Sequence, residues 1–229
     1  MNIDVAESLC LSWLKRVKKC FIVQTNWRMD KDVEDAKRDI IAEIVRDVES
    51  CCKKEGAGFC FKKTKTGRVV LNNVECDALG LAFDQHQIVF HAMDVACHLK
   101  RDGLHYSEFD KNAGKKMNVS VGRVCAKMFK TALAVYLMTE VKDGELVFAT
   151  PKIADGIKGR IEPTLKVFEG CLSKHGLRYR FNLIGGQNFY DQIESCVKQK
   201  GCVACDNELY MRSIEIHNMN PIQIATKKK

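Results

Sequence analysis

Proline and long apolar runs are scarce in this chain. Its 229 residues include 3 prolines, so few positions lack the backbone N–H that helix interiors and central strands require. No run of ~18 uncharged apolar residues occurs, which excludes a typical transmembrane helix, and we expect no membrane partner. A Walker-type phosphate loop, a dinucleotide-binding glycine fingerprint and an HExxH motif are also missing. These absences argue against a nucleotide-dependent enzyme and against a metalloprotease.

The N-terminus has little in common with a secretory signal. Asp4 and Glu7 stand where a signal peptide needs a basic and then an apolar region, so we expect a cytoplasmic protein. The 12 cysteines are therefore interpreted mainly as small hydrophobic residues in a reducing compartment. Cys202 and Cys205 have the spacing of zinc ligands, but a four-ligand site needs a second pair, so a structural zinc is not expected.

Positive charge is in modest excess. The chain carries 37 Lys and Arg against 29 Asp and Glu, which gives a formal net charge of +8. This excess favours polyanionic partners only mildly, because ordinary basic proteins also reach it. We expect nucleic acid as the partner, and a homodimer or a partner protein is left open.

Hydrophobic periodicity predicts an α/β (α+β) fold in one domain, 1–229, with a central mixed β-sheet flanked by helices. The expected helices cover 5–19, 33–52, 119–141, 159–177, 188–200 and 207–217. The expected strands, besides two acidic ones, cover 21–27, 59–63, 68–71, 146–149 and 178–184. The segment 99–116 is expected to be a long polar loop.

The two acidic strands stand out because carboxylates occupy positions where apolar residues are expected. Glu75 and Asp77 share one face of the first strand, and Asp94 lies within the apolar second strand, 88–98. The short polar segment 84–87 joins them as a hairpin, which would set Asp77 beside Asp94. Two carboxylates ~5 Å apart repel by about 3 kcal/mol at an effective dielectric of ~20, so a positive charge should lie between them.

A divalent cation such as Mg²⁺ or Mn²⁺ is the natural counter-charge for such a pair. Mg²⁺ is commonly bound by one or two carboxylates, with water and phosphate in the other positions. The alternative is that Asp77 and Asp94 end their strands or pair with Lys and Arg. Glu43, on the helix 33–52, also has two interpretations: it projects toward the carboxylates, or it lies at the border of the apolar stripe and reaches solvent.

The predicted elements follow a known order. A helix with Glu43 comes first, then a hairpin and two acidic strands, and then helix, strand and helix. This order resembles the core of the restriction-endonuclease-like PD-(D/E)XK nuclease superfamily. The resemblance implies that Asp77 and Asp94 bind one or two Mg²⁺ ions and that Glu43 adds a ligand. Glu75 would be a further ligand or would support one.

The resemblance covers 33–185 and departs from the superfamily at one motif residue. Ala96 stands two residues after the second acid, where the superfamily has a lysine. His98, on the same strand face, or Lys100 is the expected substitute in orientation or proton transfer. Two terminal parts lie outside the resemblance, an N-terminal helix and strand, 1–32, and a C-terminal helix with a basic tail, 204–229.

The implied activity is metal-assisted hydrolysis of phosphodiester bonds, of DNA rather than RNA because most of the superfamily acts on DNA. The ion would lower the pKa of a bound water and offset charge on the phosphoryl oxygens, with the Val95 carbonyl as a further ligand. His98 would accept a proton from that water. Cations of the polar loop and the following helix would hold backbone phosphates without reading bases. These cations are Lys100, Arg101, Lys115, Lys116, Arg123, Lys127 and Lys130.

Two interpretations of other classes stay open. A non-catalytic nucleic-acid- or protein-binding module on a degenerate nuclease scaffold would explain Ala96, although the clustered acids argue against it. A cysteine-based enzyme using Cys97 with His98 or His91 is disfavoured, because adjacent residues on a strand face opposite sides.

Overall fold

The computed structural model describes residues 5–55, 61, 69–71, 73–96, 99–100, 103–104, 114–150, 153 and 155–198. The helices in this part of the chain are α1 Val5–Arg16, α2 Lys31–Ala36, α3 Arg38–Lys54, α4 Gly114–Thr139, α5 Asp155–Ser173 and α6 Gln187–Lys198. The strands are β1 Ile22–Arg28, β2 Glu75–Asp84, β3 Gln87–Val95, β4 Leu99–Lys100, β5 Gly103–Leu104, β6 Asp143–Thr150 and β7 Arg178–Gly185.

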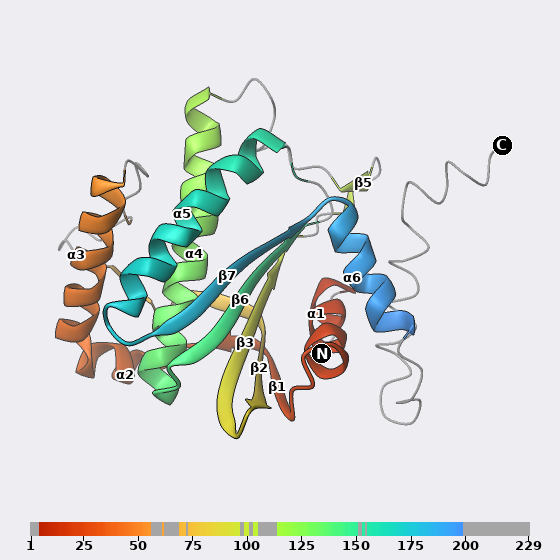
Figure 1. The fold of residues 1–229 in the computed structure, drawn as a ribbon, viewed down its shortest axis with the longest axis horizontal. Helices are drawn as coiled ribbons and strands as arrows, with labels where there is room; N and C mark the ends of the chain where they lie inside the picture. The colour runs from red at the N-terminus through yellow and green to blue at the C-terminus, as the bar shows by residue number, and fades with distance from the viewer. Residues whose placement is uncertain are drawn as a thin grey trace.

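A mixed sheet organises the fold, and within the described residues its five strands are ordered β1-β2-β3-β6-β7. β1, β2 and β3 pair antiparallel, whereas β6 pairs parallel with β3, and β7 parallel with β6. Figure 1 shows α3, α4 and α5 on one side of the sheet and α1 and α6 on the other. The chain therefore has the predicted α/β architecture, a central mixed sheet flanked by helices.

The two acidic strands form the predicted hairpin. β2 ends at Asp84 and β3 begins at Gln87, and these two residues pair across the turn. The intervening Gln85 and His86 both have positive φ, 45° and 70°, the combination that a type I′ turn requires. The twist of such a turn matches the twist of the strands, so this turn fixes the register of β2 against β3.

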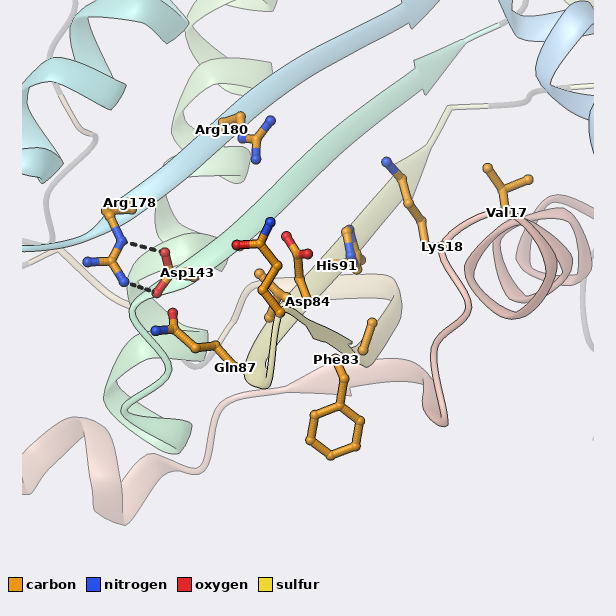
Figure 2. Close-up of a pocket in the computed structure, with 13 residues that line it drawn as sticks. Val17, Lys18, Phe83, Asp84, Gln87, His91, Asp143, Arg178 and Arg180 are labelled. Carbon is orange, nitrogen blue, oxygen red and sulfur yellow. Dashed lines mark hydrogen bonds and ion pairs between the residues drawn. The ribbon is translucent and has the colours of Figure 1, made fainter.

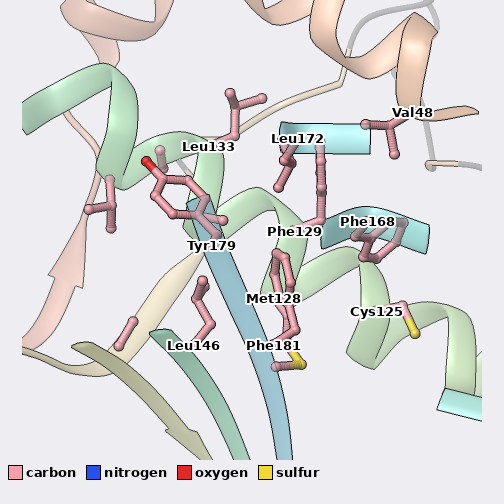
Figure 3. Packing of buried hydrophobic residues seen from close by; sticks show 14 of the residues in the cluster. Val48, Cys125, Met128, Phe129, Leu133, Leu146, Phe168, Leu172, Tyr179 and Phe181 are labelled. Atoms are coloured by element: carbon pink, nitrogen blue, oxygen red, sulfur yellow. The ribbon is translucent and has the colours of Figure 1, made fainter. Parts of the chain in front are cut away.

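Hydrophobic cores lie on both faces of the sheet. The larger core fills the space between the sheet and α3, α4 and α5 (Figure 3). Its aromatic centre consists of Phe61, Phe129, Phe168 and Phe181, whose neighbouring ring centroids lie 4.8 to 6.5 Å apart. The smaller core, under α1 and α6, includes Trp13, Leu14, Met93, Val147 and Phe189.

Two-residue alternation decides which face each strand residue occupies. On β3, Ala92 belongs to the larger core and Met93 to the smaller one. Asp94, the next residue, therefore faces α4. On β6, Leu146 belongs to the larger core, so the preceding Glu145 faces the opposite side, toward α1.

The sequence predicts one continuous helix over 33–52, and this prediction is wrong. The chain forms α2 and α3 instead, and they are separated at Lys37, whose φ of −104° and ψ of 21° are not helical. The carboxylate of Asp30 caps α2 by accepting a bond from the Asp32 N–H at 2.7 Å. Lys37 Nζ donates to the Leu137 carbonyl at 2.7 Å, near the C-terminus of α4. This long-range contact leaves no trace in the local apolar periodicity.

The predicted hairpin over 59–71 is not the neighbour of the acidic strands. The described residues of that segment, Phe61 and 69–71, lie outside strands, and β1 pairs with β2 in its place. β1 belongs to the N-terminal segment 1–32, so this segment contributes an edge strand to the central sheet.

The segment 99–116, predicted to be a loop, contains β4, β5 and the first residues of α4. The predicted helix 207–217, together with Cys202 and Cys205, lies outside the described residues. None of the described helices has the length and apolar character needed to cross a membrane.

Candidate active site

Asp77 and Asp94, here called the acid pair, are linked through backbone N–H groups at the end of the hairpin far from its turn. The backbone register of β2 against β3 runs from the turn to Ala78 opposite Met93 and stops there. Beyond it, side chains make the contacts. The Asp77 N–H donates to Asp94 Oδ1 at 3.3 Å, and the Val95 N–H donates to Asp77 Oδ2 at 2.7 Å. The structure thus brings together the two acids that the sequence predicts as neighbours.

A lysine from α4 contacts the acid pair. Lys127 Nζ lies 2.7 Å from Asp94 Oδ1, so Asp94 is ion-paired as well as hydrogen-bonded. The Asp94 side chain is 5% exposed, whereas the Lys127 side chain is 36% exposed. The long lysine stem therefore carries an ammonium group from the helix surface to a carboxylate that water hardly contacts. The sequence predicts phosphate binding for Lys127; the structure places its charge on Asp94.

Burial dominates the electrostatics of this site. It raises the pKa of Asp94 from 3.8 to about 6, while the Lys127 ammonium opposes this change and the Asp77 carboxylate adds to it. Burial alone would lower the pKa of Lys127, but the carboxylates of Asp94 and Asp77 hold it above its ordinary value. Burial and both carboxylates also raise the pKa of the Cys76 thiol well above its usual range. This neutral thiol donates to the Ala78 carbonyl at 3.1 Å.

The end of β3 is fixed against β6. The Ala96 N–H donates to the Ala149 carbonyl at 2.9 Å, and Thr150 Oγ1 donates to the Ala96 carbonyl at 3.3 Å. The Ala96 side chain packs against the larger core. The strand position that carries a lysine in the superfamily is therefore apolar here, and in the described part of the chain a cation reaches the acid pair from α4 instead.

The two predicted glutamate ligands belong to different elements, Glu75 to β2 and Glu43 to α3. Glu75 forms an ion pair with Arg28 at the end of β1. Glu43 is exposed on α3, which packs against α5 on the outer side of the helical layer (Figure 1). The structure does not bring Glu43 to the acid pair, so its solvent-facing interpretation is the correct one.

The remaining predicted residues are placed in part. His98 and Arg101 lie outside the described residues. Lys130, nearly one turn beyond Lys127 on α4, is half-buried; burial lowers its pKa, and the Glu34 carboxylate opposes this. By backbone position, the other predicted phosphate-binding cations belong to β4 or α4: Lys100, Lys115, Lys116 and Arg123.

A second carboxylate, half-buried and with a lysine of its own, lies on the opposite face of the sheet. Glu145 is contacted by Lys18 Nζ at 2.5 Å and by Asn182 Nδ2 at 2.6 Å. His91 Nδ1 lies 3.0 Å from Glu145 Oε2. Burial opposes ionisation, but the hydrogen bonds from His91 and Lys18 lower the pKa of Glu145 from 4.5 to about 2. These four residues, the Glu145 cluster, hold a stable anion.

A polar hollow of about 370 Å³ adjoins the Glu145 cluster, near the β2–β3 turn and the beginnings of β6 and β7 (Figure 2). Its lining includes Lys18, His91 and Arg180, and the Arg178 guanidinium contacts both oxygens of Asp143 at 2.5 Å. Cations and carboxylates face one another around it, so its charge is balanced. The acid pair, in which burial and a second carboxylate raise the pKa of Asp94, is the stronger functional candidate.

The contact of Lys127 with Asp94 and the contacts of Glu145 were not predicted from the sequence, for different reasons. Lys127 does carry a signal, because it stands in α4 between the fully buried Cys125 and Met128. A lysine at the edge of an apolar stripe indicates a buried partner. The contacts of Glu145 depend on the register of three strands, so no local pattern indicates them.

No family model matches the chain, and no curated protein or solved structure matches it either. The similarity to the PD-(D/E)XK superfamily therefore remains an expectation from the order of elements and the spacing of the acids. The functional assignment depends on the geometry of Asp77, Asp94 and Lys127.

Proposed function

We propose that the chain is a metal-dependent nuclease that hydrolyses phosphodiester bonds, with DNA as its substrate. The hydrogen bonds that link Asp77 to Asp94 and Val95, together with the ion pair between Asp94 and Lys127, support this most. Carboxylates this close repel each other, and proteins keep such arrangements mainly at functional sites. Phosphodiester hydrolysis gives them a defined task, the binding of a divalent cation.

The acid pair has the donor chemistry that Mg²⁺ or Mn²⁺ prefers. Mg²⁺ is commonly bound by one or two carboxylates, with water and substrate phosphate in its other positions. Within the described residues, the Lys127 ammonium and the Asp77 N–H both contact Asp94 Oδ1, so Asp94 Oδ2 is the oxygen that we propose for an ion. Asp77 and Asp94 would hold the ion, and the Val95 carbonyl is a further oxygen donor.

Other residues of the chain would supply the remaining catalytic roles. When bound, a divalent ion lowers the pKa of a water molecule and offsets charge on the phosphoryl oxygens. Lys127 places a positive charge beside the acid pair, the role that the resemblance gives to a lysine on the strand. Ala96 leaves that strand position without charge, and α4 supplies the cation in its place. His98 and Lys100 stay our proposed groups for proton transfer and orientation.

Cations before and along α4 are proposed to hold the nucleic acid. α4 begins at Gly114 and reaches the acid pair at Lys127, so basic residues on this helix lead toward the site. They would contact phosphates without reading bases, which predicts cleavage with little sequence preference. We place this activity in the cytoplasm. The proposed phosphate-binding residues are Lys100, Arg101, Lys115, Lys116, Arg123 and Lys130.

A second candidate function is a non-catalytic nucleic-acid- or protein-binding module. The Lys127–Asp94 ion pair favours it, because the pair forms with groups of the chain alone. In that case the carboxylates are structural, and nucleic acid would bind equally well with and without a divalent ion.

Calorimetry with Mn²⁺ and cleavage of plasmid and single-stranded DNA separate the two functions. We expect cleavage in Mn²⁺, its loss on chelation, and a decrease of roughly a hundredfold or more for Asp77→Asn and for Asp94→Asn, because each removes a ligand. Asp143→Asn is the matched control. It removes the same charge from the partner of Arg178, away from the acid pair, and should retain activity.

Cleavage that survives both substitutions would count against the nuclease. So would an absence of Mn²⁺ binding in a protein that still binds DNA, a result that would instead support the module.

A further inference from the structure

The polar hollow beside the Glu145 cluster has a positive end. Its lining includes Lys18 from the segment after α1, His91 from β3 and Arg180 from β7 (Figure 2). His91, Glu145 and Arg180 occupy one row across the sheet, because β3, β6 and β7 pair in register at these residues. Neighbouring strands lie about 4.8 Å apart, so the basic groups of this row converge on one end of the hollow.

The carboxylates at this end already have partners. Glu145 is contacted by the other three members of its cluster, and Asp143 gives both of its oxygens to Arg178. Within the part of the chain that the structure describes, the Arg180 side chain forms no hydrogen bond or ion pair. The charges of the hollow balance as a whole, but at this end Arg180 retains a guanidinium group that can bind an anion.

The carboxylate that opposes such an anion lies at the other end of the hollow. Among the described residues of the lining, Asp84 is the acid without a side-chain partner. Asp84 belongs to the end of β2 and pairs with Gln87, which precedes His91 by four residues. Four residues of strand span about 13 Å, so the repulsion between Asp84 and an anion at the row of His91 is weak.

We propose that the positive end of the hollow binds the phosphate group of a small phosphorylated metabolite. This site lies on the face of the sheet opposite the acid pair, and it does not depend on the proposed nuclease function. Lys18, His91 and Arg180 reach the hollow from three separate elements. A phosphate group has an acceptor oxygen for each of these donors, whereas a carboxylate has only two oxygens.

Two of the three donors are held in place before a ligand arrives. Lys18 Nζ lies 2.5 Å from Glu145 Oε2 and 4.8 Å from the centroid of the Trp13 ring. His91 is fixed through Nδ1 by Glu145. A phosphate beside His91 Nε2 favours the imidazolium, in which both ring nitrogens donate. This preorganisation lowers the entropy cost of binding, and Arg180 adds a planar fork that can donate two bonds to the phosphate.

The rest of the hollow determines the size and polarity of the ligand. Its volume of about 370 Å³ exceeds that of a phosphate group and lies at the small end of the usual range for ligand sites. Toward the turn it is lined by the amides of Gln85 and Gln87 and by the Asp84 carboxylate, groups that hydrogen-bond to hydroxyls. The expected ligand is therefore a hydroxylated phosphate monoester of about the size of a sugar phosphate.

Calorimetry on the full chain with ribose 5-phosphate, inorganic phosphate and ribose tests the proposal. We expect ribose 5-phosphate to bind, inorganic phosphate to bind more weakly, and ribose not to bind. Arg180→Gln should weaken the binding of ribose 5-phosphate by roughly tenfold or more, because it removes a charged hydrogen-bond donor. Arg180→Lys should have an intermediate affinity, since it keeps the charge but loses the fork.

The double variant Arg178→Gln with Asp143→Asn is the matched control. It removes an ion pair from the same hollow without changing the net charge, and it should bind ribose 5-phosphate as the wild type does. The proposal fails if neither phosphate compound binds, or if the double variant loses as much affinity as Arg180→Gln. Displacement of ribose 5-phosphate by a short oligonucleotide without terminal phosphates would overturn the metabolite in favour of a nucleic-acid backbone.

Discussion

Asp94 and Glu145 occupy neighbouring strands and face opposite sides of the same sheet, and each has a lysine within 2.7 Å. Their pKa values nevertheless move in opposite directions, to about 6 for Asp94 and to about 2 for Glu145. Glu145 receives contacts from Lys18, His91 and Asn182 on both of its oxygens. Asp94 is buried more deeply, and its neighbour is a second carboxylate.

A lysine partner alone therefore does not keep the pKa of a carboxylate low. Around Glu145 the chain supplies enough donors to replace water, and the ion pair stabilises the fold. At the acid pair, the described residues give Asp94 two contacts on one oxygen, and the carboxylate of Asp77 adds to the rise of its pKa. A structural site is expected to resemble the first arrangement, and a site that awaits a ligand is expected to resemble the second.

Amide substitutions at the two carboxylates should change stability in opposite directions, and this is the largest expected effect. Glu145→Gln leaves Lys18 and His91 without their anion, and we expect the free energy of unfolding at neutral pH to fall by about 3 kcal/mol. Asp94→Asn removes an unfavourable buried charge, while Lys127 can turn to solvent, and we expect an increase of about 2 kcal/mol. Urea unfolding of both variants measures these changes. A loss of stability in both variants would remove the distinction between the sites.

The pH dependence of stability should separate the same two groups. The pKa of Asp94 is raised from 3.8 to about 6, so its unfavourable contribution is absent below pH 3.8 and grows as pH rises to about 6. The pKa of Glu145 is lowered from 4.5 to about 2, so its stabilisation is complete above pH 4.5 and is lost as pH falls toward 2. The difference between wild type and Asp94→Asn should therefore appear above pH 4, and that for Glu145→Gln should shrink below it. Parallel curves for the two variants would contradict this assignment.

Local chemistry explains why the acid pair could be predicted from the sequence. Two-residue alternation places Asp77 and Asp94 on their strands, and the four residues from Asp84 to Gln87 bring those strands together. Neither step requires knowledge of distant parts of the chain. Local patterns left the position of Glu43 open, because a helix stripe indicates which face is buried but not which element packs on that face.

The parts that could not be predicted are those set by long-range packing. β1 takes the place of the hairpin predicted over 59–71, because edge pairing in a sheet is chosen among distant segments. At the break, the Lys37 side chain bonds the Leu137 carbonyl of α4, and the contact of Lys127 with Asp94 depends on how α4 crosses β3. Sequence patterns indicate which residues are buried, but only the fold determines which distant residues they contact.

Metal binding should report the protonation of Asp94. An ion binds the ionised carboxylate, so the affinity for Mn²⁺ should fall about tenfold per pH unit below the Asp94 pKa of about 6. Lys127→Met removes the cation that opposes protonation, and we expect the midpoint of this pH dependence to move upward by about one unit. Calorimetry from about pH 5 to about pH 8 measures both, with Lys127→Arg as the charge-conserving control. An affinity that does not change with pH would exclude Asp94 as a ligand.

The smallest expected effect comes from removing one donor of the Glu145 cluster. Asn182 is exposed, and Lys18 and His91 keep Glu145 ionised in its absence. We therefore expect Asn182→Ala to lower the free energy of unfolding by about 0.5 to 1 kcal/mol, the usual net value of one hydrogen bond, and to leave nuclease activity unchanged. Urea unfolding and the cleavage assay measure the two outcomes. A loss as large as that of Glu145→Gln would mean that the cluster acts as one cooperative unit, and the contrast with the acid pair would then lie in cooperativity rather than in the number of donors.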